Sequence, residues 1–176
     1  FGLMGKDESG IAEPGEIWDK MLLEYIQGRR KKPVWIIGVK HFTGETGPID
    51  YVETVFFLKE VKEDDLLSAL REGRMYVRFN LAGEPALLNE FSVKHTGFGS
   101  IQINIKVSRI PAPEPIKIEL IRNGQAFKKF EETHGQWAIT MEDSLLAGES
   151  KVYYRLKISS DSSIIFTNPI FVEVKK

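Results

Sequence analysis

The chain has 176 residues, with 24 lysines and arginines against 25 aspartates and glutamates. The formal charge of −1 gives no overall field that would draw the protein onto nucleic acid or an anionic membrane. The chain has no cysteine, which excludes disulfides, thiolate nucleophiles and cysteine-ligated metal sites. No apolar run approaches the roughly 20 residues that a membrane-spanning helix needs. We therefore expect no nucleic-acid partner and no membrane span.

The N-terminal part of the chain changes from a loose segment to a helical pattern. Residues 1–15 are rich in glycine and have no sustained periodicity, so we predict a loose lead-in there. Apolar residues then recur with helical spacing, which predicts a helix over residues 16–30 that ends near Gly28. The basic run at residues 29–32 lacks interleaved aromatic residues, and we interpret it as a solvated turn.

Strand and helix signals alternate in the next part of the chain. The continuous apolar run at residues 34–39 predicts a strand that is buried on both faces. A second apolar run predicts a strand at residues 54–58. We then expect a helix at residues 63–72 that stops at Gly73, and a strand at residues 75–79. This mixed order of elements predicts a small α/β segment.

After residue 85 the pattern changes to alternation of apolar and polar residues. Such runs lie at residues 101–107, 116–121, 126–130, 137–141, 152–158 and 164–174. Period-two alternation is typical of half-buried antiparallel strands, and Asn123-Gly124 suits a hairpin turn. Six or seven such strands in about 90 residues indicate a small immunoglobulin-like sandwich. The predicted fold is therefore α+β overall, with the α/β segment at residues 16–85 followed by an all-β sandwich at residues 86–176.

His41 is a candidate metal ligand or catalytic residue. It follows the predicted strand at residues 34–39, which is where barrels and open α/β sheets expose catalytic side chains. With Glu45 nearby, the segment offers one imidazole and one carboxylate. A catalytic zinc has three protein ligands as a rule, so an ordinary loop histidine is the alternative interpretation.

Other polar residues have simpler interpretations. Asp64 and Asp65 form a compact acidic pair that is able to hold a metal or run acid–base chemistry, but their place at a helix start explains them sufficiently. His95 and His134 lie in or beside predicted sandwich loops, without the spacing of a shared metal site. We interpret the glycine pair in residues 97–99 as part of a linker.

Aromatic residues of the predicted sandwich either build its core or form an outward platform for sugars or a protein partner. The adjacent Tyr153 and Tyr154 must point to opposite faces of their strand. The core is the default for both, and the platform is the alternative for one of them.

Several short motifs carry a family resemblance. They are Trp18-Asp19 on a helix, the run at residues 34–41, the helix-to-strand stretch at residues 67–76, and the pieces at residues 119–124, 154–156 and 166–170. With these motifs the chain resembles, from about residue 16 to its end, the C-terminal part of PHP-type metal-dependent phosphoesterases that append a β-sandwich.

The resemblance implies a metal-dependent parent enzyme. In that family an incomplete α/β barrel binds several divalent metals, and a metal-activated water attacks a phosphoester. A late family motif has an aspartate, one intervening residue and a histidine. Here His41 matches the histidine, Val39 stands in place of the aspartate, and Lys40 puts a cation between them. The family's early histidine-rich motifs are not in this chain.

We therefore expect no catalytic residue and no cofactor in this chain alone, with manganese or zinc belonging to a full-length parent. Three hypotheses follow. The chain is the C-terminal portion of a PHP-like metallohydrolase whose partner is the rest of its own parent chain. Alternatively, it is a degenerate member that became a binding or regulatory protein. The third hypothesis is a sandwich that binds a carbohydrate or protein. We favour the first for ancestry and the second for the activity of this piece.

Overall fold

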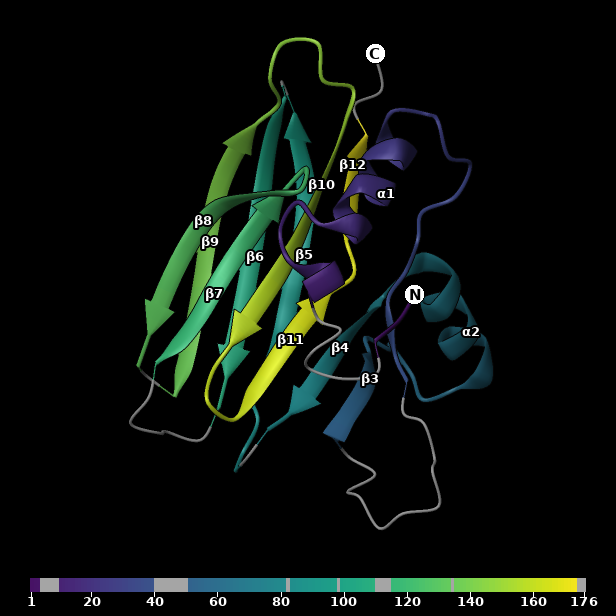
Figure 1. Ribbon diagram of the computed structural model, residues 1–176. Helices are drawn as coiled ribbons and strands as arrows, with labels where there is room; N and C mark the ends of the chain where they lie inside the picture. Colours follow the sequence, from purple (N-terminus) through teal and green to yellow (C-terminus); the bar gives the residue numbers. More distant parts are fainter. Residues whose placement is uncertain are drawn as a thin grey trace.

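The computed structural model describes residues 1–3, 10–39, 51–81, 83–97, 99–109, 115–133 and 135–173. Over these residues the chain is mostly β-strand, with two ten-residue helices (Figure 1). In chain order the elements are β1 (Gly2–Leu3), α1 (Ile17–Ile26), β2 (Ile37–Gly38), β3 (Val52–Phe56), α2 (Glu63–Glu72), β4 (Met75–Asn80), β5 (Leu87–Gly97), β6 (Ser100–Ser108), β7 (Ile116–Arg122), β8 (Gln125–Glu132), β9 (Gln136–Ser144), β10 (Lys151–Ser159), β11 (Ser163–Thr167) and β12 (Ile170–Glu173). Neither helix is long and apolar enough to cross a membrane.

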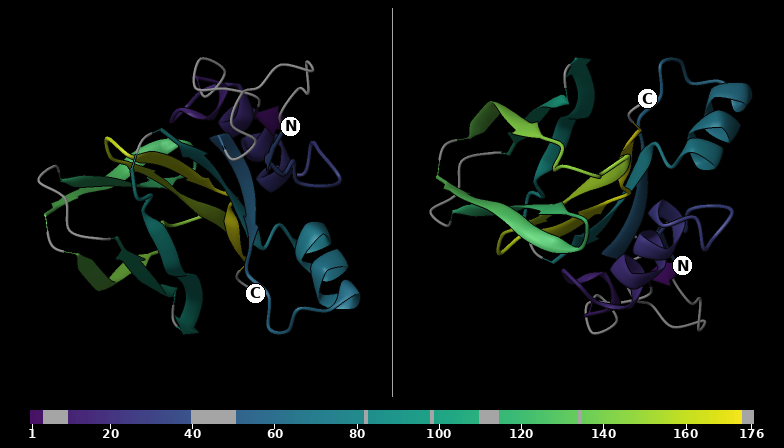
Figure 2. Two further views of the ribbon diagram at one scale, coloured as in Figure 1. Left: turned by 90° about the horizontal axis from the view of Figure 1, so that it is seen from below. Right: turned by 90° about the horizontal axis from the view of Figure 1, so that it is seen from above.

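Two antiparallel sheets form the body of the described chain. The large sheet has the order β3-β4-β11-β10-β7-β8, with β12 also paired to β10, and the small sheet has the order β5-β6-β9. The sheets face one another across an apolar core, in a sandwich-like arrangement (Figure 2). In β6 the core side chains are Ile101, Ile103 and Ile105, which alternate with more exposed polar residues. The β-rich C-terminal part predicted from alternation is thus confirmed.

Two tight turns join neighbouring strands. Asn123 and Gly124 have φ values of 49° and 82° and close the β7–β8 hairpin. Positive φ at both positions is what a type I′ hairpin turn requires, so this predicted turn is confirmed. Gly97 and Gly99 also have positive φ, and Gly97 pairs with Ser100 across the β5–β6 hairpin. The interpretation of these glycines as a linker was therefore wrong.

The large sheet crosses the predicted boundary at residue 85. β4 pairs antiparallel with both β3 and β11, so strands from residues 16–85 and 86–176 are hydrogen-bonded neighbours. The division into an α/β segment and a sandwich stays a prediction. The doubly buried strand expected at residues 34–39 was wrong, because only the short β2 forms there and Ile37 is 38% exposed.

A second apolar core lies on the other face of the large sheet (Figure 2). Trp18 and Leu22 of α1 are fully buried and belong to the same cluster as Val77, Tyr153 and Phe166 of the sheet. The central strands of the large sheet are therefore covered on both faces. This explains why β10 is buried at nearly every position from residue 152 to residue 158 instead of alternating.

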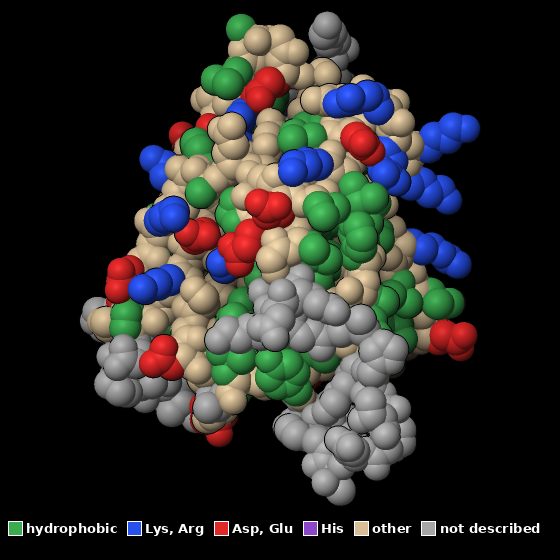
Figure 3. Space-filling view, in the orientation of Figure 1, with side chains coloured by type: hydrophobic (Ala, Val, Ile, Leu, Met, Phe, Trp, Pro, Cys, Tyr) green, Lys and Arg blue, Asp and Glu red, His purple; other side chains and the backbone are tan. Residues whose placement is uncertain are grey.

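The turn that follows α1 is basic and solvated. Arg29, Lys31 and Lys32 are exposed, and lysine and arginine side chains project from the surface at this side of the molecule (Figure 3). Arg30 forms an ion pair with Glu24 at 3.1 Å. The interpretation of this run as a solvated turn is confirmed.

A buried ion pair fastens α1 to β10. Asp19 and Arg155 are both fully buried, and the guanidinium donates from Nε to Oδ1 at 2.8 Å and from Nη2 to Oδ2 at 2.6 Å. The Tyr153 hydroxyl donates to Asp19 at 2.8 Å, and the Gly15 amide donates to it at 2.7 Å. The guanidinium lies 4.8 Å from the Trp18 ring centroid. Separating α1 from the sheet would therefore leave the buried Arg155 charge without its counter-ion.

Replacing one partner of this pair should destabilise the protein strongly. Asp19→Asn keeps the shape of the side chain but leaves the buried Arg155 charge without a counter-ion. Breaking a buried pair in this way costs about 3–5 kcal/mol, so urea denaturation should show a loss of that size. Glu13→Gln is the control, since Glu13 pairs with the partly exposed Lys157 and its loss should cost at most about 1 kcal/mol. Equal losses of unfolding free energy in the two variants would contradict the structural role given to the pair of Asp19 and Arg155.

Candidate functional site

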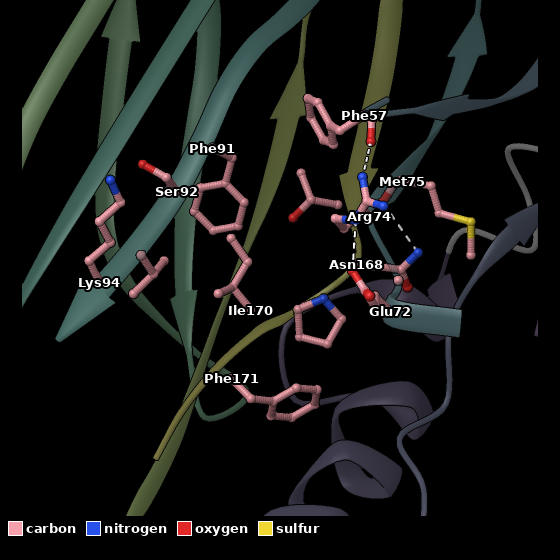
Figure 4. A pocket seen from close by; sticks show the side chains of 14 residues that line it. Phe57, Glu72, Arg74, Met75, Phe91, Ser92, Lys94, Asn168, Ile170 and Phe171 are labelled. Atoms are coloured by element: carbon pink, nitrogen blue, oxygen red, sulfur yellow. Dashed lines mark hydrogen bonds and ion pairs between the residues drawn. The ribbon is translucent and has the colours of Figure 1, made fainter. Parts of the chain in front are cut away.

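A groove of about 490 Å³ lies between the two sheets at the side of α2 (Figure 4). One wall is the end of α2 with the start of β4, at residues 72–75. The other wall is β5, at residues 91–94. The floor is the bend between β11 and β12, at residues 167–171, together with Phe57. These segments are far apart in the sequence, and only the pairing of the sheets brings them together.

Gly73 shapes the α2 wall. It ends the helix in the left-handed conformation, with φ of 72° and ψ of 22°, so the predicted stop is confirmed. A Cβ atom at this position would lie 2.6 Å from the Trp35 ring, which is too close for any side chain. Both the backbone conformation and the close packing therefore require glycine.

Arg74 joins the parts of this wall. Its Nε donates to Glu72 at 2.8 Å, its Nη1 to the Phe57 carbonyl at 2.6 Å, and its Nη2 to Asp65 at 2.8 Å. The dashed lines in Figure 4 follow its contacts with Phe57 and Glu72. Each nitrogen of the guanidinium has one partner within the protein, so Arg74 supports the wall, and these three contacts use three of its five N–H groups.

Asp65 fixes the loop before α2. It accepts hydrogen bonds from the backbone amides of Lys59 and Glu60, at 2.5 and 3.1 Å. The N-cap of α2 is Lys62, and no side chain caps it, so the helix-start explanation of the acidic pair was incomplete. The hydrogen bond from Arg74, followed by that from the Glu60 amide, lowers the pKa of Asp65 to about 2. Sequence spacing gave no signal for these contacts.

Asn168 holds the floor of the groove. This buried side chain accepts from the Ile36 amide at 2.8 Å and donates to the carbonyls of Ile36 and Met75, at 3.1 and 3.3 Å. Beside it, Thr167 accepts from the Leu156 amide at 2.8 Å. At the bend, the side chains of Thr167 and Asn168 thus bind backbone groups that a continuous strand would bind with its own backbone. The single strand predicted at residues 164–174 is split here into β11 and β12, with Pro169, which has no N–H to donate, between them.

The β5 wall has an apolar and a polar side. Phe91 and Val93 pack against the core between the sheets. On the other side, Ser92 donates to Glu90 at 3.2 Å and accepts from Asn104. Lys94 is exposed, and it forms no ion pair with any residue that the structure describes. The groove therefore combines a largely apolar surface with one exposed cation.

The two adjacent tyrosines point to opposite faces of β10, as predicted, and both are fully buried. Tyr153 donates to Asp19 on the α1 side, and Tyr154 donates to Asp143 at 2.5 Å between the sheets. Burial raises the pKa of both hydroxyls. Neither tyrosine forms an outward platform, so that alternative was wrong for this pair.

The described residues do not supply a metal centre. Within them, no group of three or more His, Cys, Asp or Glu side chains lies close enough together to hold a metal ion. His95 lies on β5 and is exposed. His41, the predicted metal ligand, and His134 both lie outside the described residues. The prediction for His41 therefore stays a prediction.

Comparisons with known proteins add no identification. A scan against models of protein families finds no match, and searches of curated proteins and of solved structures find none either. Function therefore has to be argued from the residues and their geometry.

The loop before α2 should loosen at low pH. The pKa of Asp65 in the folded chain is about 2, below its ordinary value of 3.8. Its stabilising effect is therefore complete above pH 3.8 and is lost as the pH falls through about 2. We expect NMR hydrogen-exchange protection of the Lys59 and Glu60 amides to fall over that interval. In Asp65→Asn protection should be low throughout, whereas Asp64→Asn, which changes the neighbouring carboxylate, should behave like the unmodified chain. A loss of protection in both variants would rule out the specific role of Asp65.

Proposed function

We propose that this chain is the C-terminal, non-catalytic part of a PHP-like metal-dependent phosphoesterase. Its role is to hold an immunoglobulin-like sandwich rigidly on the end of the enzyme's α/β domain. The observation that carries the proposal is that motifs distant in the sequence lie together in the structure. The short motifs that carry the family resemblance are scattered along the sequence, and several of them contact one another at the interface between residues 10–39 and the large sheet.

Two of these contacts are side-chain specific. Asp19 of the Trp18-Asp19 motif binds Arg155 of the motif at residues 154–156. Asn168, from the motif at residues 166–170, binds both backbone groups of Ile36 in the run at residues 34–41. Removing the Asp19, Arg155 or Asn168 side chain would leave buried polar groups of another motif without a partner, which supports treating the motifs as parts of one structural junction.

The N-terminal elements also suit the end of an α/β domain. β1 and β2 pair in parallel, with α1 between them in the sequence. Parallel strands need a crossover connection, and a helix is the usual one in α/β proteins. This short unit supports a junction with such a domain.

Metal chemistry is assigned to the rest of the parent chain. The donors among the described residues do not fit a metal centre, so no chemical step follows from them. Manganese or zinc would be held by histidines and acids of the parent's barrel, with His41 as a single possible contribution from this chain. The partner in this proposal is the parent chain itself.

A second candidate function is binding of a carbohydrate or protein ligand by the sandwich. The groove of about 490 Å³ beside β5 favours it, because its size is within the range of ligand sites and its surface is largely apolar.

Hydrolysis assays test the enzyme proposal. With manganese or zinc and bis(p-nitrophenyl) phosphate, the full-length parent protein should turn over, and this chain alone should not. In the parent, replacing the residue that corresponds to His41 with alanine should lower kcat/KM by at least about tenfold. The equivalent change at His95, an exposed residue of β5, is the control and should have little effect. An inactive parent with both metals would contradict the proposal.

A further inference from the structure

Two strand edges border the groove. In the described part of the chain, β5 is paired with β6 alone and β12 with β10 alone. The outer edge of each strand therefore has no β-ladder with another described strand. An unpaired edge offers backbone N–H and C=O groups to any extended chain laid beside it.

The groove lies between β5 and the end of α2. The large sheet continues past the small one through β4 and β3, and both views in Figure 2 place α2 on the same side of the large sheet as β5. The groove lies between them, with apolar side chains such as Phe57 and Ile170 at its floor.

Most polar side chains of the groove already make hydrogen bonds within the protein. Arg74, Asn168 and Thr167 make their hydrogen bonds within the protein, as described above. A sugar needs several free donors and acceptors, whereas an extended peptide can take its hydrogen bonds from a strand edge and its burial from the apolar floor.

The charge of Lys94 indicates which side chain a bound segment should carry. Lys94 is the groove residue whose cation has no ion-pair partner among the described residues, and it lies on the outer side of β5. Lysine on an edge strand deters indiscriminate pairing. The same charge makes pairing selective, because a carboxylate directly across from it is stabilising and a cation is destabilising.

We infer that the groove binds an extended peptide segment of another polypeptide, which adds to the free edge of β5. Apolar side chains at alternate positions of this segment face Phe57 and Ile170, and an acidic side chain on its other face lies across from Lys94. This inference rests on the second of the two functions proposed above.

Fluorescence anisotropy tests the inference with defined probes. The first probe is a fluorescein-labelled peptide of about ten residues that alternates valine and threonine, with a glutamate in place of a central threonine. The second probe has lysine in place of that glutamate. The third keeps the glutamate and has proline in place of a central valine. The glutamate peptide should bind, and the proline peptide should bind at least about tenfold more weakly, because proline removes a donor from the ladder.

Charge reversal locates the site. Lys94→Glu should weaken binding of the glutamate peptide at least about fivefold and make the lysine peptide the tighter ligand. Lys128→Glu changes an exposed lysine of β8, outside the groove, and should leave both affinities within about twofold. Both substitutions are on the surface, so folding should survive them.

Three results would overturn the inference. They are no binding of the glutamate peptide up to about 1 mM, equal effects of Lys94→Glu and Lys128→Glu, or displacement of the peptide by cellohexaose. The last result would keep the binding function and assign the groove to carbohydrate. Because the assay contains no metal and no phosphoester, failure of the metallohydrolase proposal would leave its outcome unchanged.

Discussion

The buried pair of Asp19 and Arg155 is the constraint on which the arrangement of the chain depends. Removing two charges from water is costly, and their attraction offsets that cost only where the geometry is good and the remaining hydrogen-bonding groups are satisfied. Here the carboxylate accepts four hydrogen bonds, two from Arg155 and one each from Tyr153 and Gly15. One Arg155 nitrogen, Nη1, has no hydrogen-bond partner. The pair thus acts less as a source of stability than as a constraint on position, because the four hydrogen bonds of the carboxylate all depend on the present placement of α1 on the sheet.

The position of α1 determines how the large sheet is used. With α1 on one face and the small sheet on the other, the central strands are buried on both sides, and residues of the N-terminal segment belong to a core shared with β10 and β11. β3 and β4 extend this sheet past the edge of the small sheet. That mismatch in width leaves the groove beside β5, so the same layering explains both the junction and the binding surface.

Local patterns predicted local structure well. The helix that ends at Gly73, the turn at Asn123-Gly124 and the alternation in β6 each depend on neighbours in the sequence, and each is found where expected. The strand at residues 34–39 was predicted wrongly, because an apolar run does not reveal which of its residues stay exposed, as Ile37 does. The groove was not predicted at all. Its floor depends on Asn168 binding Ile36, and a contact across so many residues has no periodicity to reveal it.

Asn168 also relates the two proposed functions to each other. Its amide group lies at the floor of the groove and, at the same time, holds both backbone groups of Ile36, in the run that leads to His41. A strand bound beside β5 would therefore lie one side chain away from the junction with the proposed α/β domain. Proximity of this kind does not amount to coupling, which requires an element with two arrangements that both sites favour differently. Asn168 has its hydrogen bonds satisfied in the present arrangement, so the structure favours a rigid floor that supports both sites at once over a relay between them.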